Sequence, residues 1–175
     1  MVETEGKKTN MLEVSEMKYL GFVLSESASN VPNIADKKKK ANGTIRSIMN
    51  MVKDLQNYTV QNGVIYLNSL LCSSLLYAGE TYYNLTERNY RMIERIEEDC
   101  LHQLLDTMHT CPMSNLYLET GQLPARFHIQ IMKLNILKYI LHQKKDSLIY
   151  KFFKAQCENP TKRDWVTSVK KITTL

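Results

Sequence analysis

The sequence predicts a mostly α-helical protein: a helical bundle with a short β-hairpin near its N-terminus. Three observations support this fold class. Apolar residues recur at helical spacing along most of the chain beyond residue 32. The stretch 64–76 contains no charged residue, so its helix is expected at the centre of the bundle, with other helices packed around it. Residues 10–24 carry aromatic and β-branched residues, which favour strands.

The predicted hairpin consists of strands at residues 10–14 and 17–24, joined by a tight turn at Ser15 and Glu16. A hairpin of this size is marginally stable on its own in water. We therefore expect it to belong to a sheet whose remaining strands this chain does not supply.

An amphipathic helix is predicted over residues 33–56, with Asn42 and Gly43 as a weak point that could kink it. The four consecutive lysines at 37–40 cover a full turn, so their charges point around the helix. Arg46 and Lys53 are seven residues apart and share one face. The apolar positions at helical spacing are Ile34, Ala41, Ile45, Ile48, Met49, Val52 and Leu55.

The apolar stretch at 64–76 is followed by Gly79, which we expect to close its helix in a left-handed turn. Thr86 is the predicted N-cap of a helix that runs to about residue 108. Glu94, Glu98 and Asp99 are expected mostly on the solvent side of that helix. Its predicted buried stripe is Tyr90, Ile93, Ile96, Cys100, Leu101, Leu104, Leu105 and Met108.

Four further helices are predicted towards the C-terminus, at about 115–120, 125–143, 147–157 and 162–172. Ser114 is the expected cap of the first and Gly121 closes it. The second is expected to point Phe127, Ile131, Leu134, Leu137 and Leu141 inward, and the last to carry Trp165, Val169 and Ile172 on one side. We divide the chain into a hairpin and linker (1–30), a helical bundle (31–122) and basic C-terminal helices (123–175).

The charge is distributed unevenly. Residues 61–132 carry 4 basic and 8 acidic side chains, whereas residues 133–175 carry 10 basic and 3 acidic ones. A basic surface permits binding to a polyanion, although a solvated lysine surface explains the same composition. The four cysteines are too few and too scattered for a disulfide framework, so we expect reduced thiols and an intracellular location. No secretory signal and no membrane association are predicted.

Candidate catalytic and metal-binding groups do not assemble into a site at the sequence level. Cys100 and His102 are two positions apart on a helix, so they diverge by about 200° and are expected to be a buried thiol and a surface imidazole. The acidic run Glu97, Glu98 and Asp99 is expected to form a solvated face. Neither a Gly-rich phosphate loop nor an Asp-Asp pair is present in the sequence.

Three stretches together resemble LINE-type (non-LTR) retrotransposon reverse transcriptases. Residues 75–82 (LLYAGETY) are similar to that family's thumb signature, Leu-Leu-Tyr-Gly-small-Glu-Ser/Thr-Trp. Residues 8–10 (KTN) and 18–21 (KYLG) resemble the end of its palm, where a strand pair leads into the primer-grip turn, and the resemblance places residues 18–21 at that turn. Residues 112–124 (PMSNLYLETGQLP) are similar to a segment further downstream. The order of the glycine and the small residue is exchanged here, as Ala78-Gly79, and Tyr82 replaces the tryptophan.

The resemblance implies a thumb-like helical bundle preceded by a hairpin left over from a palm sheet. It implies weak, backbone-directed binding to an RNA/DNA primer-template duplex, and association with the fingers and palm of the polymerase. The Mg²⁺ of the whole family enzyme is held by aspartates that this chain lacks, so no cofactor and no polymerase activity are expected of it alone. The implied duplex contacts are Lys18, Tyr19, Leu20, Gly21, Lys38, Lys39, Arg46 and Lys53.

Two alternatives remain open from the sequence. Tyr19 and Leu20 could simply pack the hairpin on the helices, and the lysines could form a solvated face. For the chain as a whole, the alternative is a non-catalytic helical protein-interaction module. Its acidic middle and an exposed hairpin edge are the features that favour it.

Overall fold

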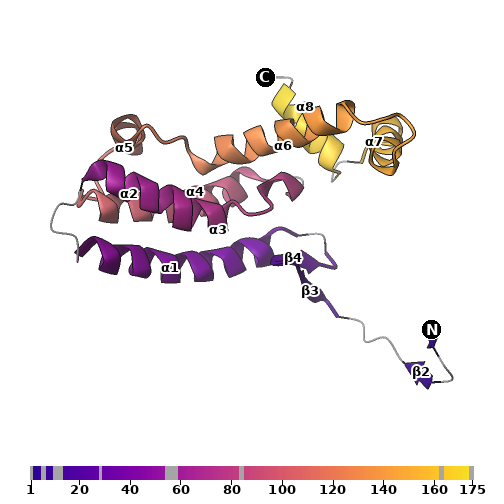
Figure 1. Cartoon of the computed structure of the whole chain (residues 1–175), viewed down its shortest axis with the longest axis horizontal. Coiled ribbons are helices and arrows are strands. Elements are labelled where there is room, and N and C mark those ends of the chain that lie inside the picture. Colours follow the sequence, from indigo (N-terminus) through magenta and orange to yellow (C-terminus); the bar gives the residue numbers. More distant parts are fainter. Residues whose placement is uncertain are drawn as a thin grey trace.

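The computed structural model is mostly α-helical with a short hairpin ahead of the helices, as the sequence predicts, and it has a further short hairpin at residues 2–9 (Figure 1). It describes the backbone of residues 2–4 and 7–9, and both backbone and side chains of residues 14–27, 29–53, 59–82, 85–161 and 164–173. The strand expected at 10–14 falls almost entirely outside the described residues. In the described ranges, none of the helices is long and apolar enough to span a lipid bilayer.

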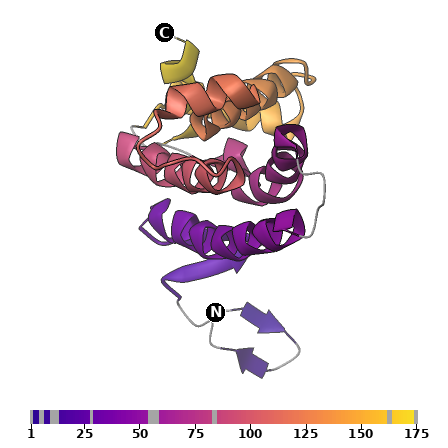
Figure 2. The ribbon, with the colours of Figure 1, turned by 90° about the vertical axis from the view of Figure 1, so that its left-hand side faces the viewer.

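The helices form three layers (Figures 1 and 2). The first layer is α1 (Val31–Lys53), which packs on α4 (Glu87–Leu104) in the second layer. The second layer also contains the helical stretch from α2 (Val60–Tyr66) onward. The third contains α6 (Ala125–Leu141), α7 (Leu148–Glu158) and α8 (Trp165–Thr173). The short helix α5 (Met113–Thr120) lies beside the beginning of α6.

Two antiparallel hairpins precede α1, and their strands differ from the predicted ones. β1 (Val2–Thr4) pairs with β2 (Lys7–Thr9), and β3 (Glu16–Tyr19) pairs with β4 (Phe22–Ser25). The predicted turn at residues 15–16 is therefore wrong, because residues 17–24 form a complete hairpin rather than one strand. Its turn is Leu20-Gly21, where both residues have positive φ, as type I′ hairpin turns require.

The helix α1 agrees with its prediction and continues without interruption through Asn42 and Gly43, the predicted weak point. Its inner face buries Ile34 and Ile48 completely. The buried face extends on both sides of Gly43, so packing on the second layer compensates for the low helix propensity of that residue.

The apolar stretch in the middle of the chain is helical throughout, but it changes its hydrogen-bonding pattern. α2 passes into a π-helical segment, η1 (Leu67–Cys72), and then into one turn of α-helix, α3 (Ser73–Leu75). Leu67 and Leu71 are completely buried. Ile65, in contrast, is 61% exposed, so this helix is covered on one face only and is not surrounded as predicted.

The caps of the later helices follow the sequence closely. Thr86 and Ser147 cap α4 and α7 by accepting hydrogen bonds from Asn89 N and Tyr150 N. Gly121 ends α5 with φ of 65°, while Pro112, rather than Ser114, precedes its first turn. The helix α4 ends at Leu104, before the predicted end.

Met108 does not extend the buried stripe of α4 and is 80% exposed. Asp106 follows the helix with φ of 47°, a conformation that cannot continue a right-handed helix. The stripe predicted for α4 therefore stops at the helix end, one turn earlier than the apolar pattern suggests.

The helix α6 is apolar on two faces, and the sequence prediction chose the wrong one. Phe127, Ile131 and Leu141 were expected inside, yet they are 46%, 45% and 56% exposed. The face that contacts the second layer carries Ala125 and Ile129, both fully or almost fully buried. The sequence analysis considered only one of the two apolar stripes of this helix, and the packing partner decides which stripe is covered.

Candidate nucleic-acid interface

The hairpin turn is attached to α1 by side chains from both elements. The Asn33 side chain accepts a hydrogen bond from Val23 N over 3.1 Å. The Asp36 carboxylate lies 3.2 Å from Lys18 Nζ and 2.8 Å from Lys40 Nζ. These two lysines lower the pKa of Asp36, with Lys40 making the larger contribution. The group of three carries a net charge of +1 at the end of α1 where the hairpin docks.

The segment that follows α3 forms a sharp turn with a left-handed residue, but that residue is Ala78 rather than Gly79. Ala78 has φ of 54°, and Gly79 begins the short 3₁₀ turn η2 (Gly79–Thr81). A Cβ atom at Gly79 would lie 3.3 Å from Met132 Sδ and 3.4 Å from Ile129 Cγ1. A side chain at position 79 would therefore crowd the side chains of α6, and Gly79 does not supply the left-handed residue that was expected of it.

Lys37 is the buried member of the four-lysine run, and it fixes this turn to α1. Its ammonium group donates hydrogen bonds to the backbone oxygens of Leu75, at 2.9 Å, and Tyr77. It also lies above the rings of Tyr77 and Tyr82, 5.9 and 5.5 Å from their centroids. Burial lowers the pKa of Lys37 to about 8. Lys37 therefore holds the carbonyls at the helix end and does not face solvent.

Tyr82 connects the same turn to the hairpin. It is completely buried, and its hydroxyl accepts a hydrogen bond of 2.9 Å from the Asn33 side-chain amide. Its ring lies 5.6 Å from the ring of Phe22, centroid to centroid. Residues 18–22 and 75–82, which are far apart in the sequence, therefore form one packed unit around Asn33 and Lys37.

The eight candidate duplex contacts fall into two groups and one outlier. Residues 18–21 meet the N-terminal half of α1. Lys39, Arg46 and Lys53 are spaced seven residues apart on the outer face of α1. Each is rotated by about 20° around the helix axis from the one before, and the three span about 21 Å along that axis. All three are exposed, and none lies within 4 Å of a described carboxylate. Lys38 is also exposed, but it projects about 100° from Lys39 and leaves this stripe.

Sequence reasoning missed two contributors beside the hairpin turn. Tyr77, which is not among the eight candidate contacts, is 51% exposed and lies between two hollows of about 310 and 340 Å³. Lys40 lines the first hollow together with Leu20 and Gly21. The position of Tyr77 inside the thumb-like signature was the signal that could have identified it. The exposed aromatic and apolar side chains at this end are Tyr19 (62%), Leu20 (73%) and Tyr77.

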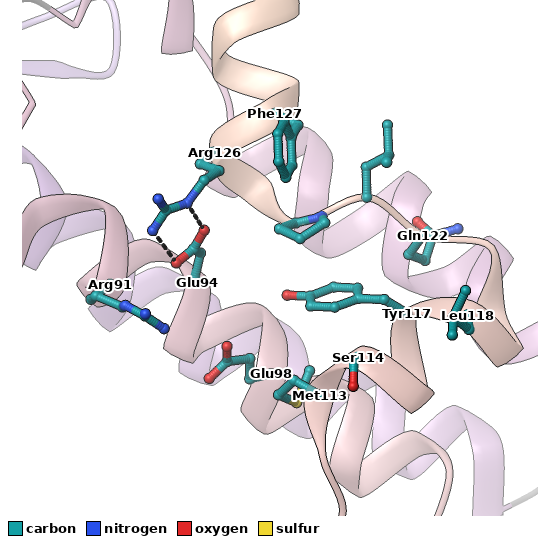
Figure 3. A pocket seen from close by; sticks show the side chains of 12 residues that line it. Arg91, Glu94, Glu98, Met113, Ser114, Tyr117, Leu118, Gln122, Arg126 and Phe127 are labelled. Atoms are coloured by element: carbon teal, nitrogen blue, oxygen red, sulfur yellow. Dashed lines mark hydrogen bonds and ion pairs between the residues drawn. The ribbon is translucent and has the colours of Figure 1, made fainter. Parts of the chain in front are cut away.

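A second concave region lies between α4, α5 and the start of α6, within the predicted motif at 112–124 (Figure 3). It has a volume of about 710 Å³, and most of its exposed lining surface is apolar. Arg126 closes one side by pairing with Glu94, at 2.5 Å, and with Glu87, at 2.7 Å. Glu94 is almost completely buried, so the prediction that placed it on the solvent side was wrong.

Glu97, which was also predicted to be solvated, is completely buried behind this groove. Its Oε2 accepts hydrogen bonds from Ala125 N at 2.9 Å and from Tyr117 Oη at 3.2 Å. Burial, with a smaller contribution from the neighbouring Glu94 and Glu98, raises the pKa of Glu97 to about 7, although the two hydrogen-bond donors act in the opposite direction. Glu97 therefore joins α4, α5 and α6.

The Cys100 and His102 pair does not behave as fully predicted. Cys100 is buried, as expected, but His102 is buried too and was wrongly placed at the surface. Its Nδ1 lies 2.9 Å from Thr107 Oγ1, in the turn that brings the chain back after α4. All four cysteines are free. Over the described ranges, no three His, Cys, Asp or Glu side chains are grouped so that they could hold a metal ion.

Comparison of the chain with protein-family models, with curated proteins and with solved structures found no match.

Proposed function

We propose that this chain is the thumb-like part of a LINE-type reverse transcriptase, including the end of the palm and the primer grip, and that it grips the backbone of a primer-template duplex. The observation that carries the proposal is the contact between two stretches of the resemblance. The hairpin turn at 18–21 packs against the turn at 75–82, and Tyr82 and Lys37 hold both to α1.

The backbone conformation at position 78 also supports the proposal. In the family signature this position is the glycine, and here Ala78 has φ of 54°, a conformation that glycine adopts most readily. In this chain the signature's glycine and small residue are exchanged, so position 78 carries an alanine side chain. The left-handed turn at position 78 is nevertheless formed.

In the proposed complex, the outer face of α1 lies along the duplex. Lys39, Arg46 and Lys53 donate to phosphate oxygens over about 21 Å. The exposed turn with Tyr19 and Leu20 lies at the end of the stripe, beside the primer. Contacts to phosphate position a duplex without reading its sequence. Polymerisation requires the palm aspartates and their Mg²⁺, which belong to the remainder of such an enzyme, and the proposed location is intracellular.

The test measures binding to an RNA–DNA hybrid by fluorescence anisotropy over a series of salt concentrations. For the wild type we expect log affinity to fall linearly with log salt concentration. The double variant Arg46→Ala/Lys53→Ala should bind more weakly, with a salt slope that is shallower by about 1.8, at roughly 0.9 per phosphate contact. The matched control is Lys138→Ala/Lys171→Ala, which removes the same charge from exposed positions of α6 and α8.

Equal losses in the two double variants would show that affinity follows net charge alone, and would contradict a specific role for α1. A folded wild type that binds no hybrid at low salt would remove the proposed nucleic-acid function altogether.

The alternative function, a helical protein-interaction module, is favoured by the uncovered apolar stripe of α6. Ile131 and Leu134 are 45% and 36% exposed on the face opposite the core. Exposed apolar surface of this kind marks contact sites for other proteins. Such a module would bind a protein partner and show no salt-dependent affinity for the hybrid.

A further inference from the structure

The groove between α4, α5 and the start of α6 is shaped to receive apolar side chains. Leu118, Leu123 and Phe127 line it and are 81%, 48% and 46% exposed. Figure 3 shows Phe127 and Tyr117 on opposite sides of the opening. Its volume of about 710 Å³ lies within the range of sites that hold a bound molecule. Exposed apolar surface in a concave region marks a contact site for another molecule. The described part of the chain does not fill this groove.

The uncompensated charge at this groove is negative. Arg126 is engaged by Glu94 and Glu87, and Arg91 lies 3.6 Å from Glu87. Glu98 lines the groove and forms no ion pair of 4 Å or less with a described side chain. Burial and the nearby Glu94 raise its pKa. An occupant that carries a cation next to apolar side chains would therefore fit this groove.

The helix α7 has these properties. None of its residues is fully buried. Leu148 and Phe152 are 85% and 64% exposed, and a spacing of four residues places them on the same face. Lys151 lies between them in sequence, and Lys145 lies just before the helix, both exposed. This face is apolar at its centre and positively charged beside it.

The helix α7 cannot reach the groove of its own chain. The groove lies at the beginning of α6 and α7 follows its end, so the 17 residues of α6 separate them by about 25 Å. Figure 1 shows α5 and α7 at opposite ends of the third layer. Only the α7 of another molecule is available to the groove.

We propose that the groove binds α7 of a second copy of this chain, with Leu148 and Phe152 against its apolar wall and a lysine beside Glu98. The two surfaces differ, so the contact is heterologous and every copy offers one groove and one helix. The proposed self-association is independent of duplex binding, which uses α1 in the opposite layer.

Sedimentation velocity of the full chain over about a hundred-fold range of concentration tests the proposal, since association by mass action shifts with concentration. The wild type should sediment faster as its concentration rises. Leu118→Asp blocks the groove and Leu148→Asp blocks the helix. Because both side chains are more than 80% exposed, neither change should affect folding, which circular dichroism can verify. Each variant alone should remain a monomer.

An equimolar mixture of the two variants gives the decisive measurement. The Leu118→Asp chain retains its helix and the Leu148→Asp chain retains its groove, so the mixture should form a complex of two chains and nothing larger. The control Met51→Asp places the same charge on an exposed residue of α1 and should associate like the wild type.

Three results would overturn the proposal. These are a wild type that remains monomeric throughout, a blocked variant that associates as strongly as the wild type, and a mixture of the two variants that remains monomeric.

Discussion

The carboxylate of Glu97 accepts a hydrogen bond of 2.9 Å from the backbone amide of Ala125, the first residue of α6. Amides in the first turn of a helix have no partner within the helix, and the N-terminus favours negative charge. A completely buried side chain of α4 thus serves as the cap of α6. Its second oxygen, Oε1, has no hydrogen-bond partner among the described residues.

This arrangement predicts a pH dependence of stability. The pKa of Glu97 rises from 4.5 to about 7 on folding, mainly through burial. Between these two values the folded protein retains a proton that the unfolded chain has released. The free energy of unfolding should therefore decrease as pH rises from 4.5 to 7, by on the order of 3 kcal/mol, and be insensitive to this group above that range.

The variant Glu97→Gln tests this prediction because it keeps an acceptor oxygen and cannot ionise. Relative to the wild type, its free energy of unfolding should increase between about pH 4.5 and pH 7. Urea unfolding at several pH values measures the difference. Glu119→Gln, on the exposed side of α5, is the control and should follow the wild type. Parallel curves for the wild type and Glu97→Gln would contradict the assignment.

Lys37 should be far more important for stability than its neighbour in the lysine run. Lys37→Met leaves the Leu75 and Tyr77 carbonyls without their charged donor, in a region that is almost closed to water. We expect a loss of about 1–3 kcal/mol in the free energy of unfolding. Lys38→Met, at an exposed position, should change it by less than about 0.5 kcal/mol. Chemical denaturation of the two variants compares them directly, and similar losses would argue against the buried role.

Ala78→Gly should stabilise the protein. The alanine has φ of 54°, and a left-handed conformation costs a residue with a side chain roughly 1–2 kcal/mol. The greater freedom of glycine in the unfolded chain offsets part of this gain, so we expect about 0.5–1 kcal/mol. Thermal unfolding should show a higher midpoint. The same substitution at Ala155, exposed in α7, should lower the midpoint, because glycine weakens a helix interior.

A lower midpoint for Ala78→Gly would mean that the left-handed turn after α3 is not formed in solution. It would also remove one of the two structural supports for the proposed relation to the thumb signature.

The hairpin shows how turn chemistry can be misread in a sequence. Residues 17–24 contain consecutive strand-forming residues, so they were predicted as one strand. Leu20 is an unusual residue for a left-handed position, so strand propensity concealed the Leu20-Gly21 turn, whereas the family resemblance placed the primer-grip turn at residues 18–21. The sheet register then follows from the turn, with Tyr19 opposite Phe22.

Local signals alone determined much of this protein. The apolar periodicity of α1 and α4, the caps at Thr86 and Ser147, and the left-handed end at Gly121 depend on residues within one or two turns. Because these features depend on residues close by in the sequence, they can be predicted without knowledge of the tertiary structure.

The tertiary structure decided which of several equivalent faces is buried. Glu97 belongs to a run of three acidic residues, and only the approach of α5 and α6 distinguishes it from its neighbours. Lys37 likewise differs from Lys38 only because the end of α3 lies beside it. A helix presents each side chain in a direction fixed by its own geometry, but whether that direction meets water or protein depends on elements that are distant in sequence.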